Sequence, residues 1–303
     1  MFGALLGLIS AAAFGGNSII TRRGMFRFSP YYIAAISVFT GPFFFFILAA
    51  VLGQLSQADG YGWKVYLFFT IAGIGHFALG RNWAYRSIQL VGATRSNIVT
   101  SLHPVVTTVL ATAVLKERIP AVMLIGILFS LAGPFLILVK ENTAKGRPHR
   151  AKWEPDRSTL YRGILYGTGT MLFWGSSAIF IKLGLASGGS AVMGSLIAYT
   201  SASLAISPSS FLRKERREEI LHSGLGSLRW ALVSGLMTST AQFLRYSALA
   251  TGSAIVVSLM LQTQTLWVLI FAFLFSRGDE SFSRWVLLGS GLLIAGTILI
   301  LLS

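Results

Sequence analysis

Residues 85–117 read YRSIQLVGATRSNIVTSLHPVVTTVLATAVLKE, and this stretch decides the fold. It begins with a polar turn and continues as a long apolar segment, residues 96–115, that ends at Glu117. About 20 mostly apolar residues span a bilayer as a helix, so the segment predicts a membrane-spanning helix. His103 and Pro104 stand near its middle. A membrane helix keeps such residues where it faces protein or a water-filled cavity.

The composition of the whole chain indicates the same class of protein. Of its 303 residues, 54% are hydrophobic and only 12% are charged, whereas soluble domains carry about 25% charged residues. The apolar residues occur in blocks of about 20, as in polytopic helical membrane proteins. A β-barrel needs alternating segments of about 10 residues, and the four phenylalanines at 43–46 do not alternate. The chain has no cysteine, which excludes disulfides and thiolate metal sites.

The sequence predicts an all-α integral membrane protein with ten transmembrane helices. No basic residue precedes the first apolar run, so we interpret it as a membrane helix and not as a cleaved signal peptide. We expect the connections 140–162 and 213–228 to be solvated cytoplasmic loops. The expected helices are 2–21, 30–53, 63–83, 94–115, 120–139, 163–183, 190–212, 229–249, 252–275 and 283–302.

The two halves of the chain repeat one another. At offsets of 160 and then 163 residues, glycines and a glutamate fall at matching positions through successive helices. Five helices per half is an odd number, so the second half enters the membrane from the opposite side, as in many secondary transporters. The first repeat is residues 1–139, the basic linker is 140–162 and the second repeat is 163–303. The matches include Gly7 with Gly167, Gly15 with Gly175, Glu117 with Glu280, Gly126 with Gly289, and Ala132-Gly133 with Ala295-Gly296.

The formal charge of +15 reflects an uneven distribution of Lys and Arg. Twenty of the 25 lie on the side of the connections after expected helices 1, 3, 5, 7 and 9. Because basic residues gather in cytoplasmic loops, this count places both termini outside the cytoplasm. It also explains the positive charge without a nucleic-acid partner.

Polar residues inside the expected helices are candidates for a substrate site. Gly15 and Gly16 precede Asn17, and Gly175 lies among Trp174, Ser176 and Ser177 at the matching place. These glycines indicate either close packing or a bend that turns Asn17, Trp174 and Ser177 toward a substrate. Proline frees a carbonyl group in the preceding turn, and the imidazole of His103 beside it can bind a substrate. The matching region of the second half carries the polar side chains of Gln262 and Gln264.

Four arginines lie near the ends of expected helices 3, 4 and 8: Arg81, Arg86, Arg95 and Arg245. Extending to the membrane surface is the simple alternative for each, since long cationic side chains snorkel. Arg81 and Arg245 are the better candidates for a cavity, with Trp83, Tyr85 and Tyr246 as aromatic walls. We interpret His76 as a packing or hydrogen-bonding group.

The acidic residues are informative because none stands in the middle of an expected helix. Glu117 and Glu280 lie at helix ends, where a cap or a surface ion pair is expected. An interior that is cationic or neutral suits an anionic or zwitterionic substrate. The sequence shows no Walker lysine loop, no Ser/His/Asp grouping and no metal-ligand spacing, so we expect no enzyme, no cofactor and no metal.

A further set of residues recurs in both halves, more loosely in the second. In the first half it is Gly80-Arg81, Tyr85-Arg86-Ser87, Gly92-Ala93, Pro104, Glu117, Gly126 and Ala132-Gly133, and in the second half 245–249, Gly252, Glu280, Gly289 and Ala295-Gly296. This pattern resembles the EamA-like domain of the drug/metabolite transporter superfamily. The resemblance implies ten helices in two inverted repeats, a cavity lined mainly by helices 1, 3, 4, 6, 8 and 9, and substrates such as amino acids, other small metabolites or phosphorylated sugars. It also implies cytoplasmic termini, opposite to the charge count. Small multidrug antiporters of the superfamily need a membrane-embedded carboxylate, which disfavours a drug-cation pump.

The leading hypothesis is a secondary transporter that moves a zwitterionic or anionic metabolite, such as an amino acid, by alternating access. The alternative is a translocator or membrane enzyme that acts on a lipid-linked phosphate, with arginines as phosphate clamps. A scaffold without transport is the third and least favoured hypothesis, because a buried His-Pro pair and matched polar breaks are costly to keep for packing alone. The expected partners are a small-molecule substrate and the lipid bilayer of a bacterial inner membrane, with the protein as a monomer or homodimer.

Overall fold

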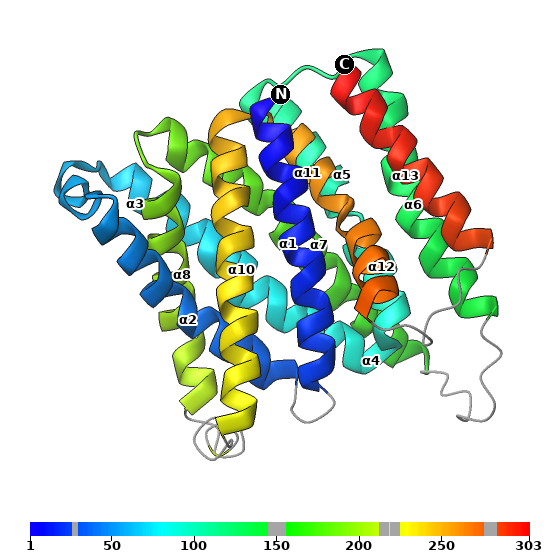
Figure 1. The fold of residues 1–303 in the computed structure, drawn as a ribbon, viewed down its shortest axis with the longest axis horizontal. Coiled ribbons are helices and arrows are strands. Elements are labelled where there is room, and N and C mark those ends of the chain that lie inside the picture. The colour runs from blue at the N-terminus through cyan, green and yellow to red at the C-terminus, as the bar shows by residue number, and fades with distance from the viewer. Residues whose placement is uncertain (26–29, 145–155, 212–217, 219–224, 276–283) are drawn as a thin grey trace.

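The computed structural model describes residues 1–25, 30–144, 156–211, 218, 225–275 and 284–303. Throughout these residues the regular structure is helical and no strand occurs. Figure 1 shows the helices side by side in one bundle, with both termini at the same end. The helices before the central connection are α1 Phe2–Met25, α2 Pro30–Val51, η1 Leu55–Gly60, α3 Trp63–Gly73, η2 Ile74–Gly80, α4 Arg81–Thr100, α5 His103–Leu110, η3 Ala111–Leu115 and α6 Ala121–Ala144. Those after it are α7 Arg157–Ala186, α8 Ala191–Phe211, α10 Leu225–Thr251, α11 Ala254–Gln262, α12 Gln264–Phe275 and α13 Arg284–Leu302.

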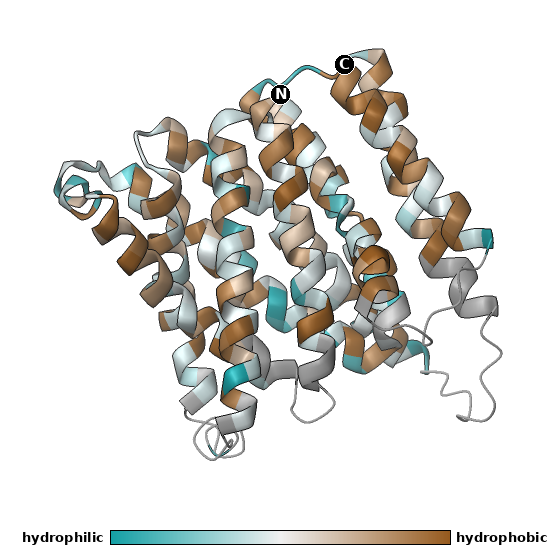
Figure 2. Cartoon of the chain, in the orientation of Figure 1, coloured by the Kyte–Doolittle hydropathy of each residue, from teal (hydrophilic) through white to brown (hydrophobic). Residues whose placement is uncertain are grey.

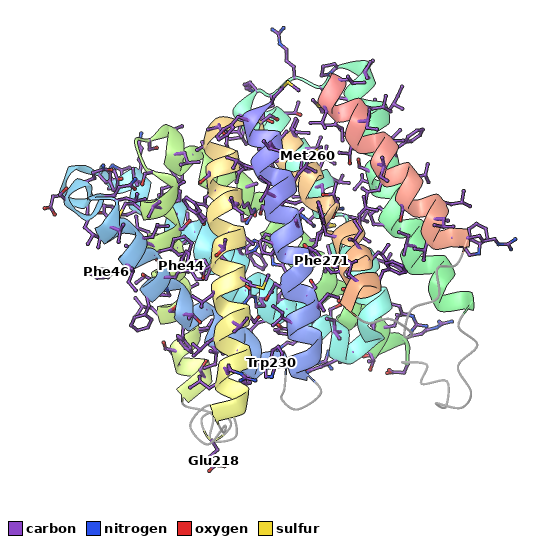
Figure 3. The ribbon with its side chains drawn as sticks, in the orientation of Figure 1. Phe44, Phe46, Glu218, Trp230, Met260 and Phe271 are labelled. Carbon is purple, nitrogen blue, oxygen red and sulfur yellow. The ribbon has the colours of Figure 1, made fainter. Side chains whose placement is uncertain are left out.

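The outer surface of the bundle is apolar, as a lipid environment requires. In the described residues, seven segments are long and apolar enough to cross a membrane, and Ala35–Val51 and Ala121–Ile137 are shorter apolar helices. Figure 2 shows brown along most of α13, and teal turns in the middle of the view between α10 and α1. Figure 3 shows Phe46 on the outer side of α2, where 55% of its surface is exposed. The chain is therefore an integral, multi-pass membrane protein.

The two segments expected as helices 4 and 9 are each interrupted near the middle. In the first half, α4 ends at Thr100 and α5 begins at His103, with Pro104 in its first turn. In the second half, α11 ends at Gln262 and α12 begins at Gln264. No proline is present there, and instead the hydroxyl and the N–H of Thr263 both donate to the carbonyl of Met260, at 2.6 and 3.1 Å. The polar breaks inferred from the sequence are thus real interruptions of both helices.

The polar turn expected at the start of 85–117 is shorter than predicted. Residues 81–91 continue the helix of α3 and η2, and only Gly92 departs from it, with φ 83° and ψ 159°. The helix extends because it packs on α7: the hydroxyl of Ser87 donates to the carbonyl of Gly163, 2.8 Å away. Residues with a Cβ atom rarely adopt a positive φ, whereas glycine does so readily, so a glycine stands where the chain turns.

Helices also extend into both ends of the stretch assigned to the central linker. α6 continues to Ala144, and α7 begins at Arg157 with Asp156 as its N-cap, whose carboxylate accepts from the N–H of Ser158 at 3.2 Å. Residues 145–155 and most of the expected loop 213–228 lie outside the described residues.

The repeat is visible in a reciprocal pair of close contacts between α6 and α13. A Cβ atom on Gly126 would lie 3.0 Å from the carbonyl oxygen of Gly296, and one on Gly133 would lie 2.5 Å from that of Gly289. Gly126 matches Gly289 and Gly133 matches Gly296 in the sequence repeat, so exchanging the halves exchanges the two contacts. The numbering rises along one helix as it falls along the other, so these corresponding helices run antiparallel.

A second reciprocal pair decides between the two interpretations of the matched glycines in α1 and α7. A Cβ atom on Gly15 would lie 2.6 Å from the Cβ of Trp267, and one on Gly175 would lie 2.6 Å from the Cβ of Val106. Both helices continue unbroken through these positions. The glycines therefore allow α1 to approach α12 and α7 to approach α5, which is the close-packing interpretation.

Candidate functional site

A cavity of about 660 Å³ lies beside the two helix breaks. Its walls come from α1, η2, α4, α5, α7, α10, α11 and α12, with Ser37 of α2 and Pro134 of α6 at the edge. These elements include all six helices that the family resemblance implied, expected helices 1, 3, 4, 6, 8 and 9. Eight of the ten residues predicted to bind substrate line it: Asn17, Arg81, Tyr85, His103, Trp174, Arg245, Gln262 and Gln264.

Ser177 and Trp83 are the two predicted residues that do not line the cavity. Ser177 is buried just behind the wall, where it holds Arg245. Trp83 packs between Tyr166 and Phe173, with ring centroids 5.5 and 5.3 Å away. Two residues along a helix turn the side chain by about 200°, so Trp83 faces away from the side occupied by Arg81 and Tyr85.

Tyr246, the third expected aromatic wall, belongs to the hydrophobic core. It is 1% exposed and stacks on Phe69, with ring centroids 6.1 Å apart. The expectation that Tyr246 would wall the cavity is wrong, because its neighbour Arg245 occupies the face of α10 that points inward.

Arg245 is the centre of a closed hydrogen-bond network. Only 5% of the residue is exposed. Its Nη2 donates to the hydroxyl of Ser177 at 2.8 Å, and its Nη1 donates to Oε1 of Gln242 at 3.4 Å. The side chain is held inside the bundle by these neutral partners, so it does not extend to the membrane surface.

His76 closes this network from η2. Its Nε2 lies 3.3 Å from Nε2 of Gln242, and its Nδ1 lies 3.2 Å from the hydroxyl oxygen of Ser177. Because the Gln242 amide nitrogen is a donor, His76 Nε2 is the acceptor and the hydrogen resides on Nδ1. The imidazole is therefore neutral in this arrangement, and the guanidinium of Arg245 is the charged member of the network.

The expectation that His76 is a packing or hydrogen-bonding group is confirmed by its bonds to α7 and α10, whereas its place in the cavity wall and that of Gln242 were not predicted from the sequence. Gln242 is three residues before Arg245, and residues three apart share a helix face, so this spacing was available as a signal. His76 and Arg81 are five residues apart, and they both line the cavity because η2 is a π-helix. π-helical turns are frequent at functional sites, but nothing in the sequence marks this one.

Arg81 supplies a second cation to the cavity wall. Its Nη1 donates to the hydroxyl of Ser37 at 2.8 Å, and its guanidinium carbon lies 5.6 Å from the ring centroid of Phe77. Arg86 and Arg95 are exposed instead, as expected of arginines that extend to the membrane surface.

The break in the first half is closed by polar side chains from both halves. The Nδ1 of His103 lies 3.1 Å from the carbonyl oxygen of Thr100, and Nε2 of Gln262 donates to the carbonyl of Ser101 at 2.8 Å. The ring of His103 also meets the ring of Trp174 edge-on, with centroids 6.2 Å apart.

The α1 wall of the cavity is joined to the second half by neutral groups. Nε2 of Gln264 donates to the hydroxyl of Ser18 at 3.2 Å, and the hydroxyl of Ser234 donates to Oδ1 of Asn17 at 2.8 Å. This side of the cavity can form hydrogen bonds but carries no charge.

No Asp or Glu lines the cavity within the described part of the chain. Glu117 instead accepts hydrogen bonds from the hydroxyl of Ser253 at 2.6 Å and from the N–H groups of Ala254 and Ile255 at 2.8 and 3.1 Å. It caps the N-terminus of α11, so the expectation of a cap is confirmed. Glu280 lies outside the described residues. Among the described residues, no group of three or more His, Cys, Asp or Glu side chains could hold a metal ion.

The apolar bundle and its central polar cavity define a multi-pass helical membrane protein, an architecture found among solute carriers. The model of the EamA-like transporter family matches residues 1–139 and 161–302. The chain belongs to the EamA-like transporter family, which lies in the drug/metabolite transporter superfamily. Members of the family are transporters.

Two further comparisons concern the curated proteins and the solved structures. No curated protein matches the chain. Among the solved structures, 27 chains match. One, described as "Crystal structure of protein", has a TM-score of 0.79 and 13% identity, and the match covers 99% of this chain and 97% of that chain. This likeness concerns the fold alone.

Proposed function

We propose that the protein is a secondary transporter, and not an enzyme, that carries a small anionic or zwitterionic metabolite across the membrane by alternating access. The observation that carries the proposal is the cavity beside both helix breaks, with Arg81 and Arg245 in its wall and no lining acid among the described residues. A cation kept inside a membrane bundle is costly, and an anionic substrate group compensates it.

The proposal includes ten membrane crossings arranged as two inverted five-helix repeats. We count α10 among the ten although it is not one of the seven long apolar segments. Its 27 residues extend about 40 Å, which is long enough to cross a bilayer. Its polar residues Ser234, Thr238, Gln242 and Arg245 line the cavity and lower its hydropathy without meeting lipid. The antiparallel α6 and α13 support the inverted relation.

The cavity extends toward the end of the bundle opposite the termini. Its lining residues in α1 are Phe14 to Thr21, in the C-terminal half of that helix, and those in α4 include Ser96 and Asn97. At the other end, a Cβ atom on Gly3 would lie 2.7 Å from Gly252, and Nζ of Lys182 donates to the carbonyl of Gly252 at 2.9 Å. These contacts support a state that is closed on the side of the termini.

The described helix ends that lead into the basic connections lie on the open side. The positive-inside rule then supports an inward-open state with both termini outside the cytoplasm. The bacterial inner membrane is the proposed location, the protein is a monomer or homodimer, and no nucleic acid binds it. Because the chain has no cysteine, introduced cysteines test the orientation. A membrane-impermeant maleimide should label Thr21→Cys from the cytoplasmic side and leave it unlabelled from outside.

Uptake by proteoliposomes tests the transport proposal. We expect saturable uptake of at least one radiolabelled organic anion or amino acid, lowered about tenfold or more by Arg245→Gln, since removing the charge removes an interaction of about 1.4 kcal/mol or more. Arg118→Gln, a change at an exposed cation outside the cavity, should leave uptake unchanged. A retained thermal unfolding transition shows that the Arg245 variant is folded, and Arg81→Gln gives an independent second variant.

The same proteoliposomes distinguish metabolite transport from the alternative, translocation of a lipid phosphate. Movement of a fluorescent lipid phosphate, with no uptake of any soluble compound, would refute the proposed transport of metabolites. His103→Ala and Gln264→Ala should lower soluble uptake while leaving the protein folded, because both side chains line the cavity.

A further inference from the structure

The hydrogen-bond acceptors nearest the helix breaks are already used by the protein. The carbonyl of Thr100 receives Nδ1–H of His103 at 3.1 Å, that of Ser101 receives Gln262 at 2.8 Å, and that of Met260 receives two donors from Thr263. Carbonyl groups freed at helix breaks coordinate cations such as Na⁺ in transporters, so they are the acceptors expected for a cationic group of a substrate. Here each of them already accepts at least one hydrogen bond from the same chain.

Carbonyls elsewhere in the wall are occupied in the same way. The hydroxyl of Thr107 donates to the carbonyl of Gly175 at 2.8 Å, and Nε1 of Trp174 donates to that of His76 at 3.2 Å. The hydroxyl of Ser177 donates to the carbonyl of Trp174 at 3.1 Å. The wall around Arg245 therefore presents few acceptors to a substrate.

The charges of the wall have one sign in the described residues. Arg245 and Arg81 contribute two cations, and the lining set contains no carboxylate. Glu117 places its carboxylate on the N-terminus of α11. The other acceptors are amide and hydroxyl oxygens such as those of Asn17 and Gln264, which form hydrogen bonds with an ammonium group but do not neutralise its charge.

We infer that the substrate is an organic anion that carries a carboxylate or phosphate group and no charged amine. This inference rests on the proposed transport function and narrows its substrate class. A carboxylate or phosphate gains charge-assisted hydrogen bonds from a guanidinium. An ammonium group loses its hydration, meets no anion and lies near two cations, each of which disfavours it. The cavity of about 660 Å³ suits a metabolite-sized ligand.

Matched pairs of compounds test the inference, since the members differ only in the amine. The pairs are succinate with aspartate, 2-oxoglutarate with glutamate, and 3-phenyllactate with phenylalanine. Binding is followed by thermal shift of the purified full chain in detergent, and uptake by proteoliposomes with radiolabelled compounds. In each pair that is recognised, we expect the amine-free member to have a half-saturating concentration at least about tenfold lower. Arg245→Gln should remove this preference.

A variant with an added carboxylate in the cavity wall provides the positive control. Gln264→Glu places a carboxylate of nearly the same shape in the wall, so the preference for the amine-free member should shrink about tenfold or more toward the amino acid. Gln89→Glu, at an exposed position of α4 outside the lining set, introduces the same charge and should leave the preference unchanged.

The outcomes separate this inference from the transport proposal. Uptake of the amino acid with equal or lower half-saturation than its amine-free partner would overturn the inference and leave the transport proposal standing. No binding and no uptake of any member, with wild-type protein that is folded, would overturn both.

Discussion

The cap that Glu117 forms on α11 predicts a measurable loss of stability when it is removed. Its carboxylate accepts three hydrogen bonds of 2.6 to 3.1 Å from the first turn of a helix in the other half. A helix cap contributes about 0.5–2 kcal/mol, and a hydrogen bond to a charged group about 1.5–3 kcal/mol. Glu117 is half-buried, so water replaces part of this, and we expect Glu117→Ala to lower the free energy of unfolding by about 2–3 kcal/mol.

Glu117→Gln separates the charge from the hydrogen bonds. It keeps one acceptor oxygen and should cost about half as much, since a neutral acceptor forms weaker bonds. The assay is reversible unfolding of the full chain in mixed detergent micelles. Asp59→Ala, at an exposed acid of η1, is the matched control and should stay within about 0.5 kcal/mol of wild type. A loss for Glu117→Ala no larger than this control's would refute the cap as a link between the halves.

Three further predictions follow from other contacts. Gly296→Val should lower the free energy of unfolding by about 1–3 kcal/mol, because a Cβ atom would lie 2.6 Å from the backbone of Ser130, whereas Gly291→Val on the same helix meets open space and should be neutral in the same assay. Lys182→Met should cost about 1 kcal/mol of stability by removing the bond to the Gly252 carbonyl, and an unchanged unfolding midpoint would contradict that contact. Ser177→Ala should raise the half-saturating substrate concentration about tenfold with little change in maximal uptake, because Arg245 loses a 2.8 Å bond that positions it; equal values for variant and wild type would remove Ser177 from the site.

The sequence was sufficient for the class, the repeat and the location of the breaks. Apolar blocks, His103-Pro104 and the matching Gln262 and Gln264 are local features, and each describes its own segment without knowledge of its neighbours. The spacing of the repeat matches Gly126 with Gly289 and Gly133 with Gly296. The contacts of Gly126 with Gly296 and of Gly133 with Gly289 could not be predicted from it.

The remaining parts of the site depend on which side of its helix each residue faces, and on which neighbouring helix it meets. Trp83 lies between two lining residues in the sequence but faces away from the cavity. His76 reaches the cavity because η2 is π-helical, and a π-helical turn shifts the faces of the residues after it. The matched glycines of α1 and α7 indicated either a bend or a close approach. The contacts of Gly15 with Trp267 and of Gly175 with Val106 show the close approach, and these contacts cannot be inferred from the sequence.

The reciprocal contact between α6 and α13 has a consequence for each half taken alone. Gly126 contacts Gly296, which is the repeat equivalent of Gly133. In the same way, Gly133 contacts Gly289, which is the repeat equivalent of Gly126. The contact surface of α6 is therefore similar to the α13 surface on which it packs. A copy of one half, placed upside down against another copy of the same half, would form the same glycine contacts along this seam.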